Sequence, residues 1–115
     1  MPVWRYLFTH RLENDPSLNL LRAFHREELF FLFGHLDRLG NPYTPSADEI
    51  QLSETLIGYW TRFAATGDPN GPGAFHWPRY SKHDEILQLD VTPARFRGYD
   101  NRQCNFLTPL INRIP

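Results

Sequence analysis

The first strand-like segment places the strongest constraint on the fold of this chain. Residues 2–8 read PVWRYLF, and every position except Arg5 is apolar or aromatic. A near-continuous run of this kind is typical of a strand covered on both faces, as in a parallel α/β sheet, because an exposed hairpin alternates apolar and polar residues. Such a strand on its own would leave its backbone unpaired on both sides. The run therefore predicts α/β structure and a chain that forms the end of something larger.

The clearest local element is a long helix predicted for residues 47–66. Ser46 and Glu49 form an S-x-x-E capping box, in which the two side chains satisfy free amides at the helix start. Gly67 is typical of a helix end, and Pro69 prevents continuation. One broad apolar stripe recurs at helical spacing, and we expect its members in the core: Leu52, Leu56, Tyr59, Trp60 and Phe63.

The rest of the chain predicts short elements joined by turns. Polar, proline and glycine residues mark the turns, and short apolar runs mark the strands. The expected segments are a loop at 9–19, a turn at 40–42, a loop at 67–73, a hairpin of 86–89 with 94–96, and a last helix at 100–114 that Pro109 interrupts.

Composition argues against several classes of function. The chain has 115 residues and a net charge of −1, so no electrostatic feature favours nucleic acid or an anionic membrane. No apolar run approaches the roughly 18 residues of a membrane span, and the first residues lack the features of a secretory signal. We leave the compartment open, with the cytoplasm slightly favoured. Cys104 stands alone and is expected to be a free thiol.

One histidine occupies an unusual place in the sequence. His25 lies in RAFHREELFFLFG (22–34), shortly before the apolar residues 29–33, which are expected to be buried. An imidazole suits acid–base chemistry because its unperturbed pKa is about 6.5. Judged without wider context, a loop histidine that caps a strand or helix is the commoner interpretation.

The other titratable residues carry weaker signals. Neighbouring Glu27 and Glu28 point apart in a helix or strand, so we do not expect a paired acid and base. No ligand-like spacing indicates a metal site, and no cofactor is expected. The remaining histidines are therefore interpreted as surface or hydrogen-bonded residues: His10, His35, His76 and His83.

Four sequence blocks follow one another along the chain: PVWRYLFTH (2–10), AFHREELFFLFG (23–34), YWTRFAATGDPN (59–70) with WPRY (77–80), and ILQLD (86–90). In this order the blocks resemble the C-terminal portion of type-B carboxylesterases. This α/β-hydrolase family includes bacterial para-nitrobenzyl esterases, cholinesterases and the non-catalytic neuroligins. The resemblance implies that residues 1–115 are the C-terminal segment of such a domain: a core strand, a catalytic-histidine loop, a long amphipathic helix, a small hairpin and a terminal helix.

The resemblance also implies roles for individual residues. His25 stands where the family has its catalytic histidine, the general base towards a serine hydroxyl and then the general acid towards the leaving alkoxide. Glu28 matches a recurrent family glutamate three residues later, interpreted as a buried structural acid or as one that supports the histidine, and not as the triad acid. Two positions depart from the pattern: Arg26, where the family usually has a small residue, and Phe30, where proline is common.

The remaining parts of a serine esterase are absent from this sequence. The α/β-hydrolase triad runs in the order serine, acid, histidine, with the serine in G-x-S-x-G. Neither Ser17, Ser46, Ser53 nor Ser81 lies between glycines at that spacing. We therefore expect a histidine-bearing part of a serine carboxylesterase that acts on carboxylic esters together with a missing N-terminal portion. The chain alone should be inactive, because loss of a triad serine removes on the order of 10⁶-fold in turnover.

A second hypothesis comes from another class of protein. The chain could be a non-catalytic, cholinesterase-like binding or assembly module in which residues 100–114 pack against a partner. The presence of His25 favours the esterase hypothesis, because an adhesive protein has no chemical need for that residue. Under either hypothesis the orphan strand and uncovered apolar surface predict a homo-oligomer or a bound complementary fragment.

Overall fold

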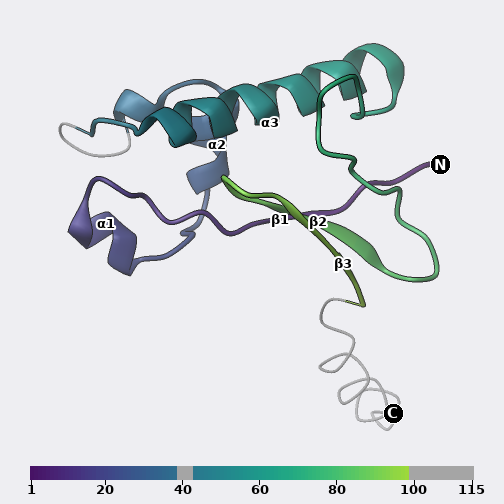
Figure 1. The fold of residues 1–115 in the computed structure, drawn as a ribbon, viewed down its shortest axis with the longest axis horizontal. Helices are drawn as coiled ribbons and strands as arrows, with labels where there is room; N and C mark the ends of the chain where they lie inside the picture. Colours follow the sequence, from purple (N-terminus) through teal and green to yellow (C-terminus); the bar gives the residue numbers. More distant parts are fainter. Residues whose placement is uncertain (39–42, 99–115) are drawn as a thin grey trace, which may run out of the picture.

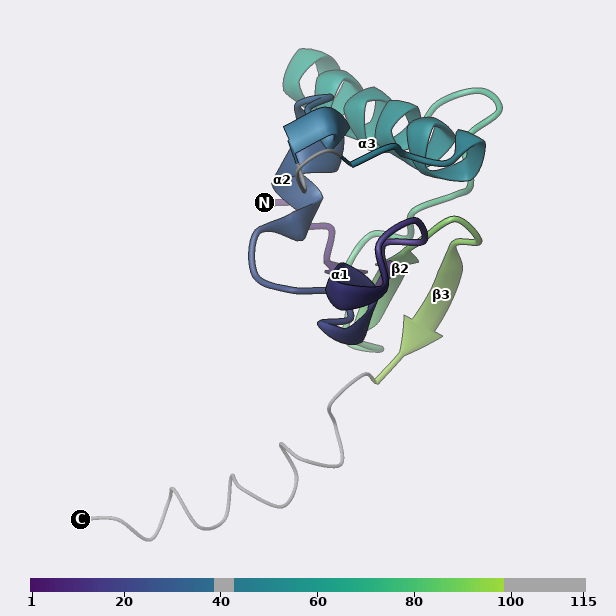
Figure 2. The ribbon, with the colours of Figure 1, turned by 90° about the vertical axis from the view of Figure 1, so that its left-hand side faces the viewer.

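The computed structural model describes residues 1–38 and 43–98, so the expected turn at 40–42, the last helix and Cys104 lie outside the described residues. Figures 1 and 2 show the helices Glu27–Leu32 and Ala47–Thr66 on one side of a small sheet. The elements in chain order are β1 (Tyr6–Phe8), α1 (Pro16–Leu20), α2 (Glu27–Leu32), the 3-10 helix η1 (Leu36–Arg38), α3 (Ala47–Thr66), β2 (Glu85–Leu89) and β3 (Ala94–Arg97).

The described strands form one sheet in the order β1-β2-β3. Strands β2 and β3 are antiparallel, with Ile86 opposite Phe96, which confirms the predicted hairpin. Strand β1 pairs with β2 in parallel, with Tyr6 opposite Leu87, so the expectation that β1 is unpaired on both sides is wrong. Parallel neighbours need a long crossover connection, and the segment that contains α3 supplies it.

The first strand is shorter and less covered than residues 2–8 predict. On one face, the Tyr6 ring packs edge-on against Trp60 of α3, and the Phe8 ring packs against Phe31 of α2. Val3 is nevertheless 49% exposed and Tyr6 is 38% exposed. Within the described part of the chain, helices cover one face of β1, and no other strand pairs with its outer edge. The expected burial on both faces is therefore wrong for this chain.

Helix α3 begins and ends where its local signals predict. The Ser46 hydroxyl accepts a bond from the Glu49 amide at 3.1 Å, and the Glu49 carboxylate accepts one from the Ser46 amide at 3.0 Å. Gly67 caps the other end at a φ of +80°, in the left-handed region that favours glycine. Phe63 is 49% exposed, so its expected place in the core is wrong. It meets Trp4 edge-on and lines an apolar cavity of about 290 Å³ instead.

The core lies between α3, α2 and the sheet. Its buried members come from every part of the described chain: Leu12, Phe31, Leu36, Tyr43, Leu52, Leu56, Tyr59, Trp77, Leu87 and Leu89. Clusters of this kind contribute most of the favourable free energy of folding, because apolar burial is worth about 25 cal/mol per Å². The long helix and the hairpin thereby hold the N-terminal segment between them.

Two short α-helices and the 3-10 helix η1 are not among the elements predicted from the sequence. In α1 the Asp15 side chain caps the helix, accepting bonds from Ser17 N–H and Leu18 N–H, and a proline follows at the first helical position. This Asp-Pro-Ser signal lies inside the expected loop at 9–19. Helix α2 contains residues 29–32 of the apolar run 29–33, and Phe33 caps its end. Only Phe31 of that run is fully buried, and Phe33 is 65% exposed. A helix buries one side only, so the expected burial of the whole run is wrong.

Candidate functional site

The candidate catalytic histidine lies in the segment of residues 9–26, which joins β1 to α2 and which we call the histidine loop. His25 is exposed and stands in a turn directly before Glu27, the first residue of α2. No hydrogen bond joins it to another of the described residues. The placement after the core strand and outside regular helix agrees with the sequence prediction.

The turn that presents His25 is closed by a backbone bond. The amide of Glu27 donates to the carbonyl of Phe24 at 3.1 Å, so His25 and Arg26 are the two central residues of the turn. Arg26 has a φ of +68°, in the left-handed region where a side chain is strained. This backbone conformation favours glycine, because any side chain with a Cβ atom is strained there.

The two glutamates that follow differ sharply in burial. Glu27 is fully buried, whereas Glu28 is partly exposed. Glu27 shares one side of α2 with the buried Phe31, four residues later, and Glu28 is turned by about 100° from it. The burial that the sequence interpretation placed on Glu28 therefore falls on Glu27.

The carboxyl group of Glu27 is unusual in its surroundings. Neither oxygen has a hydrogen-bond partner among the described residues. Burial raises the pKa of Glu27 to about 8; the charge of His10 opposes that rise, and the carboxylates of Glu49 and Asp90 add to it. At neutral pH this side chain is therefore mostly an uncharged acid in the core.

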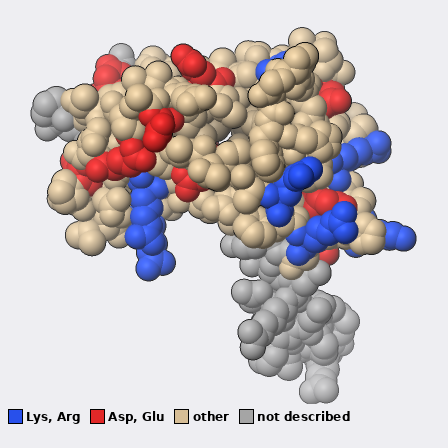
Figure 3. All heavy atoms as spheres, in the orientation of Figure 1, with Lys and Arg blue, Asp and Glu red and all other residues tan. Residues whose placement is uncertain are grey.

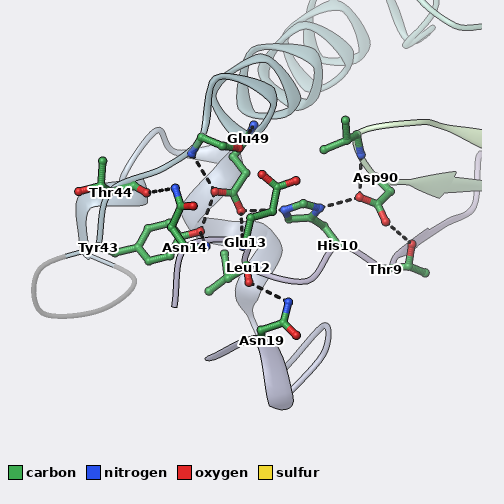
Figure 4. Close-up of polar contacts among 12 residues, drawn as sticks. Thr9, His10, Leu12, Glu13, Asn14, Asn19, Tyr43, Thr44, Glu49 and Asp90 are labelled. Atoms are coloured by element: carbon green, nitrogen blue, oxygen red, sulfur yellow. Dashed lines mark hydrogen bonds and ion pairs between the residues drawn. The ribbon is translucent and has the colours of Figure 1, made fainter. Parts of the chain in front are cut away.

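A buried histidine forms two short contacts with carboxylates (Figure 4). The His10 ring, only 3% exposed, lies between two carboxylates. Its Nδ1 is 2.6 Å from Asp90 Oδ1, and its Nε2 is 2.7 Å from Glu49 Oε2. Ionised carboxylates only accept hydrogen bonds, so both ring nitrogens must donate and the ring is an imidazolium. Burial alone would lower the pKa of His10, but the bonds to Asp90 and Glu49 raise it to about 9.

The contacts continue outward from these three residues, which we call the His10 cluster. The Tyr43 hydroxyl donates to Glu49 Oε1 at 2.6 Å, and the Glu13 amide donates to Glu49 Oε2 at 3.3 Å. Burial and the bond to Glu49 raise the pKa of Tyr43 above its usual range. On the other side, the Thr9 hydroxyl donates to Asp90 Oδ2 at 3.3 Å. The cluster thus joins the histidine loop to α3 and to the end of β2.

Sequence reasoning placed His10 only among the surface or hydrogen-bonded histidines. It is hydrogen-bonded but buried, whereas His35, His76 and His83 are exposed. Its partners lie 39 and 80 residues away in the chain, so no local spacing indicates the cluster.

Other kinds of site find little support in the described residues. Ser46 caps α3, Ser53 donates to the Phe31 carbonyl, and Ser81 bonds Glu85. Ser17 bonds Asp15 through its backbone amide, and none of these four serines is bonded to His25 within the described residues. Within residues 1–38 and 43–98, no group of acidic, histidine or cysteine side chains is arranged to hold a metal ion. None of the helices described is both long and apolar enough to cross a bilayer. Acidic and basic side chains both occur on the face in Figure 3, without a continuous basic surface.

Solved structures contain the same arrangement within a larger domain. A PNB esterase matches with a TM-score of 0.77 and 33% identity, over 92% of this chain and 21% of that one. A thermophilic PNB esterase matches with a TM-score of 0.79 and 33% identity, over 92% and 22%. The fold is accordingly that of the α/β-hydrolases, of which this chain forms a mixed α/β part.

Sequence comparison identifies the family. The carboxylesterase family profile matches residues 1–107, and the chain belongs to the carboxylesterase family. The medium-chain fatty acyl-CoA hydrolase precursor of Anas platyrhynchos is 34% identical over 98% of this chain and 20% of its own length. The cocaine esterase of Homo sapiens is 35% identical over 91% and 19%. The chain thus spans about a fifth of the length of these relatives.

Proposed function

We propose that this chain is the histidine-bearing part of a serine carboxylesterase and that His25 is its catalytic base. The observation that supports this proposal is an exposed histidine in a tight turn after a parallel strand, in a chain of the carboxylesterase family. One of the relatives is named as a fatty acyl-CoA hydrolase and another as a cocaine esterase. Both names describe cleavage of an acyl bond by water, so ester hydrolysis is the reaction we assign.

In this reaction His25 would act twice. Its imidazole first takes the proton of a serine hydroxyl as the oxygen attacks the ester carbonyl, and then returns a proton to the leaving alkoxide. Water enters in a second cycle of the same two transfers and releases the acid. The exposure of His25 suits this role because the ring is free to meet a serine and an acid supplied from outside the described residues.

The rest of the domain would supply those groups, together with the oxyanion donors. The outer edge of β1 and exposed apolar side chains such as Val3, Leu29 and Phe33 offer a surface for it to cover. The chain alone should therefore be inactive, because oxyanion donors and nucleophile account for most of the rate enhancement. The homo-oligomer expected from the sequence stays a prediction.

The test is reconstitution of the complete domain. The chain, mixed with or joined to the N-terminal portion of a carboxylesterase domain, should hydrolyse a short-chain p-nitrophenyl ester, and a serine-directed phosphonate should abolish that activity. His25→Ala should remove nearly all turnover, by analogy with the roughly 10⁶-fold loss in other triads. His35→Ala, an exposed histidine just after α2, is the matched control and should cost little.

The alternative is a binding or assembly module without catalysis. If the assembled domain hydrolyses the ester equally well with His25→Ala, the catalytic assignment is wrong. If the chain docks with the N-terminal portion but the assembled domain does not hydrolyse the ester, the binding-module hypothesis replaces the esterase hypothesis.

A further inference from the structure

The histidine loop, residues 9–26, has both of its ends at the His10 cluster. At its start, His10 itself is bonded to Glu49 and Asp90. At its end, α2 begins with the buried Glu27, and the Phe31 ring of the same helix packs edge-on against the His10 ring, with centroids 5.6 Å apart. The two ends of the loop therefore meet around one imidazole ring.

Bonds in the first half of the loop tie it further to the start of α3. The Glu13 amide donates to Glu49, the cluster member on α3, and Asn14 Nδ2 donates to the Thr44 carbonyl at 2.6 Å. Asn19 Nδ2 donates back to the Leu12 carbonyl at 3.1 Å and closes the loop on itself (Figure 4). His25 makes no such bond among the described residues. The position of its ring therefore depends on the contacts that hold the rest of the histidine loop.

We propose that His10 is a positioning residue for His25: as a cation held between Glu49 and Asp90, it fixes both ends of the histidine loop and hence the place of the catalytic imidazole. This inference rests on the proposed function of His25. His10 itself touches no substrate in this scheme and acts only through the loop.

The charge of His10 is the essential part of the proposal. A neutral imidazole carries one N–H, so deprotonation would turn a lone pair towards one of the two carboxylates and replace a bond by repulsion. The pKa of His10, raised to about 9, places that loss on the alkaline side. Because the pKa of His10 is raised in the folded state, its contribution to the folded arrangement is fully present below about pH 6.5, the ordinary pKa of histidine. This contribution disappears as the pH rises through about 9.

The groups that face His10 from the surrounding elements favour the same direction. Glu49 comes from α3, Asp90 from the end of β2 and Glu27 from α2, while Tyr43 bonds the far oxygen of Glu49. All four are acids. Ionisation of Glu27, whose pKa burial raises to about 8, adds a negative charge that holds the proton on His10. The loop should therefore stay in place until the upper end of the pH range.

The pH profile of the assembled enzyme tests this proposal. The kcat for p-nitrophenyl butyrate would be measured from about pH 5 to about pH 10, after subtraction of the uncatalysed rate. We expect an acid limb from His25 and an alkaline limb near pH 9 from His10. Glu49→Gln removes one carboxylate next to the imidazolium and should move the alkaline midpoint down by about one pH unit or more, because a neighbouring opposite charge shifts a pKa by roughly 1–3 units.

Two controls separate positioning from general stability. Glu54→Gln changes an exposed carboxylate on the same helix and should leave both limbs in place. Asp90→Asn tests the other carboxylate without touching the capping box of α3, and it should repeat the downward shift. In both cluster variants the acid limb and KM should stay near their wild-type values, since His25 and the ester-binding groups are unchanged.

The outcomes are distinguishable. An alkaline limb that stays in place in Glu49→Gln and Asp90→Asn overturns the positioning role, while the loss of nearly all turnover in His25→Ala still supports the proposed function. An enzyme that is inert, or active without His25, refutes the proposed function before any cluster variant is made. If neither cluster variant assembles, ring NMR of wild-type His10 decides: an ordinary pKa near about 6.5 refutes the proposal, and titration together with the alkaline limb supports it.

Discussion

Replacing Glu27 by glutamine should stabilise the chain, and the gain should grow with pH. The side chain is fully buried, and neither oxygen has a partner among the described residues. Burial raises the pKa of Glu27 from 4.5 to about 8, so folding at neutral pH requires the carboxylate to take up a proton. Glutamine has nearly the same shape and no proton to take up, so the variant is free of that penalty.

The size of the effect follows from linkage. Because the pKa of Glu27 is raised in the folded state, the protonated side chain is compatible with folding and the ionised one is not. The contribution of Glu27 to stability is fully present below about pH 4.5 and is lost as the pH rises through about 8. One pKa unit corresponds to about 1.4 kcal/mol. At pH 7, Glu27→Gln should therefore raise the free energy of unfolding by about 3 kcal/mol, whereas near pH 4.5 the gain should be under about 1 kcal/mol.

Urea unfolding followed by circular dichroism at several pH values measures this difference. Glu28→Gln is the matched control, because Glu28 is the next residue on α2 and is partly exposed. The control should change stability by less than about 0.5 kcal/mol. A gain for Glu27→Gln that is the same at pH 4.5 and pH 7, or a loss at pH 7, would show that Glu27 is not a buried neutral acid.

Two further substitutions test the packing and the histidine turn. Leu56→Ala should lower the free energy of unfolding by about 2–5 kcal/mol, because Leu56 is fully buried in the core. Its neighbour Ile57 is 38% exposed, so Ile57→Ala should lower it by less than about 1 kcal/mol. Equal losses in the two variants would refute this account of the core. Arg26→Gly should raise the free energy of unfolding by roughly 0.5 kcal/mol, because glycine adopts the positive φ of residue 26 without strain. Arg26→Ala keeps the strain and should not raise it. A gain in the alanine variant would assign the effect to loss of the arginine charge.

Because the chain belongs to the carboxylesterase family, the same substitutions can also be tested for their effect on activity. The chain spans about a fifth of its relatives, so the substitutions above can be compared in the chain alone and in the assembled domain. A stabilising change such as Glu27→Gln that lowers turnover in the assembled domain would show that the buried acid serves the reaction and not the fold.

Local signals allowed the sequence by itself to determine several elements. The capping box at Ser46 and the glycine at Gly67 predict both ends of α3, because each end is decided by hydrogen bonds and backbone angles within a few residues. The hairpin of β2 and β3 is predicted for the same reason, since its two strands are neighbours in the chain. The position of His25 in a loop after the first strand is implied by the family blocks, and the structure places His25 in an exposed turn there.

Only the tertiary structure decided which residues become buried and which charges meet. β1 pairs with β2 across some eighty residues, and His10 meets Glu49 and Asp90 from three separate segments. Which of two adjacent glutamates is buried depends on the side of α2 that packs inward, and Phe63 is exposed although its spacing matches the core stripe. Burial depends on what lies across from a side chain, and those neighbours are distant in sequence, so spacing along the chain carries no record of them.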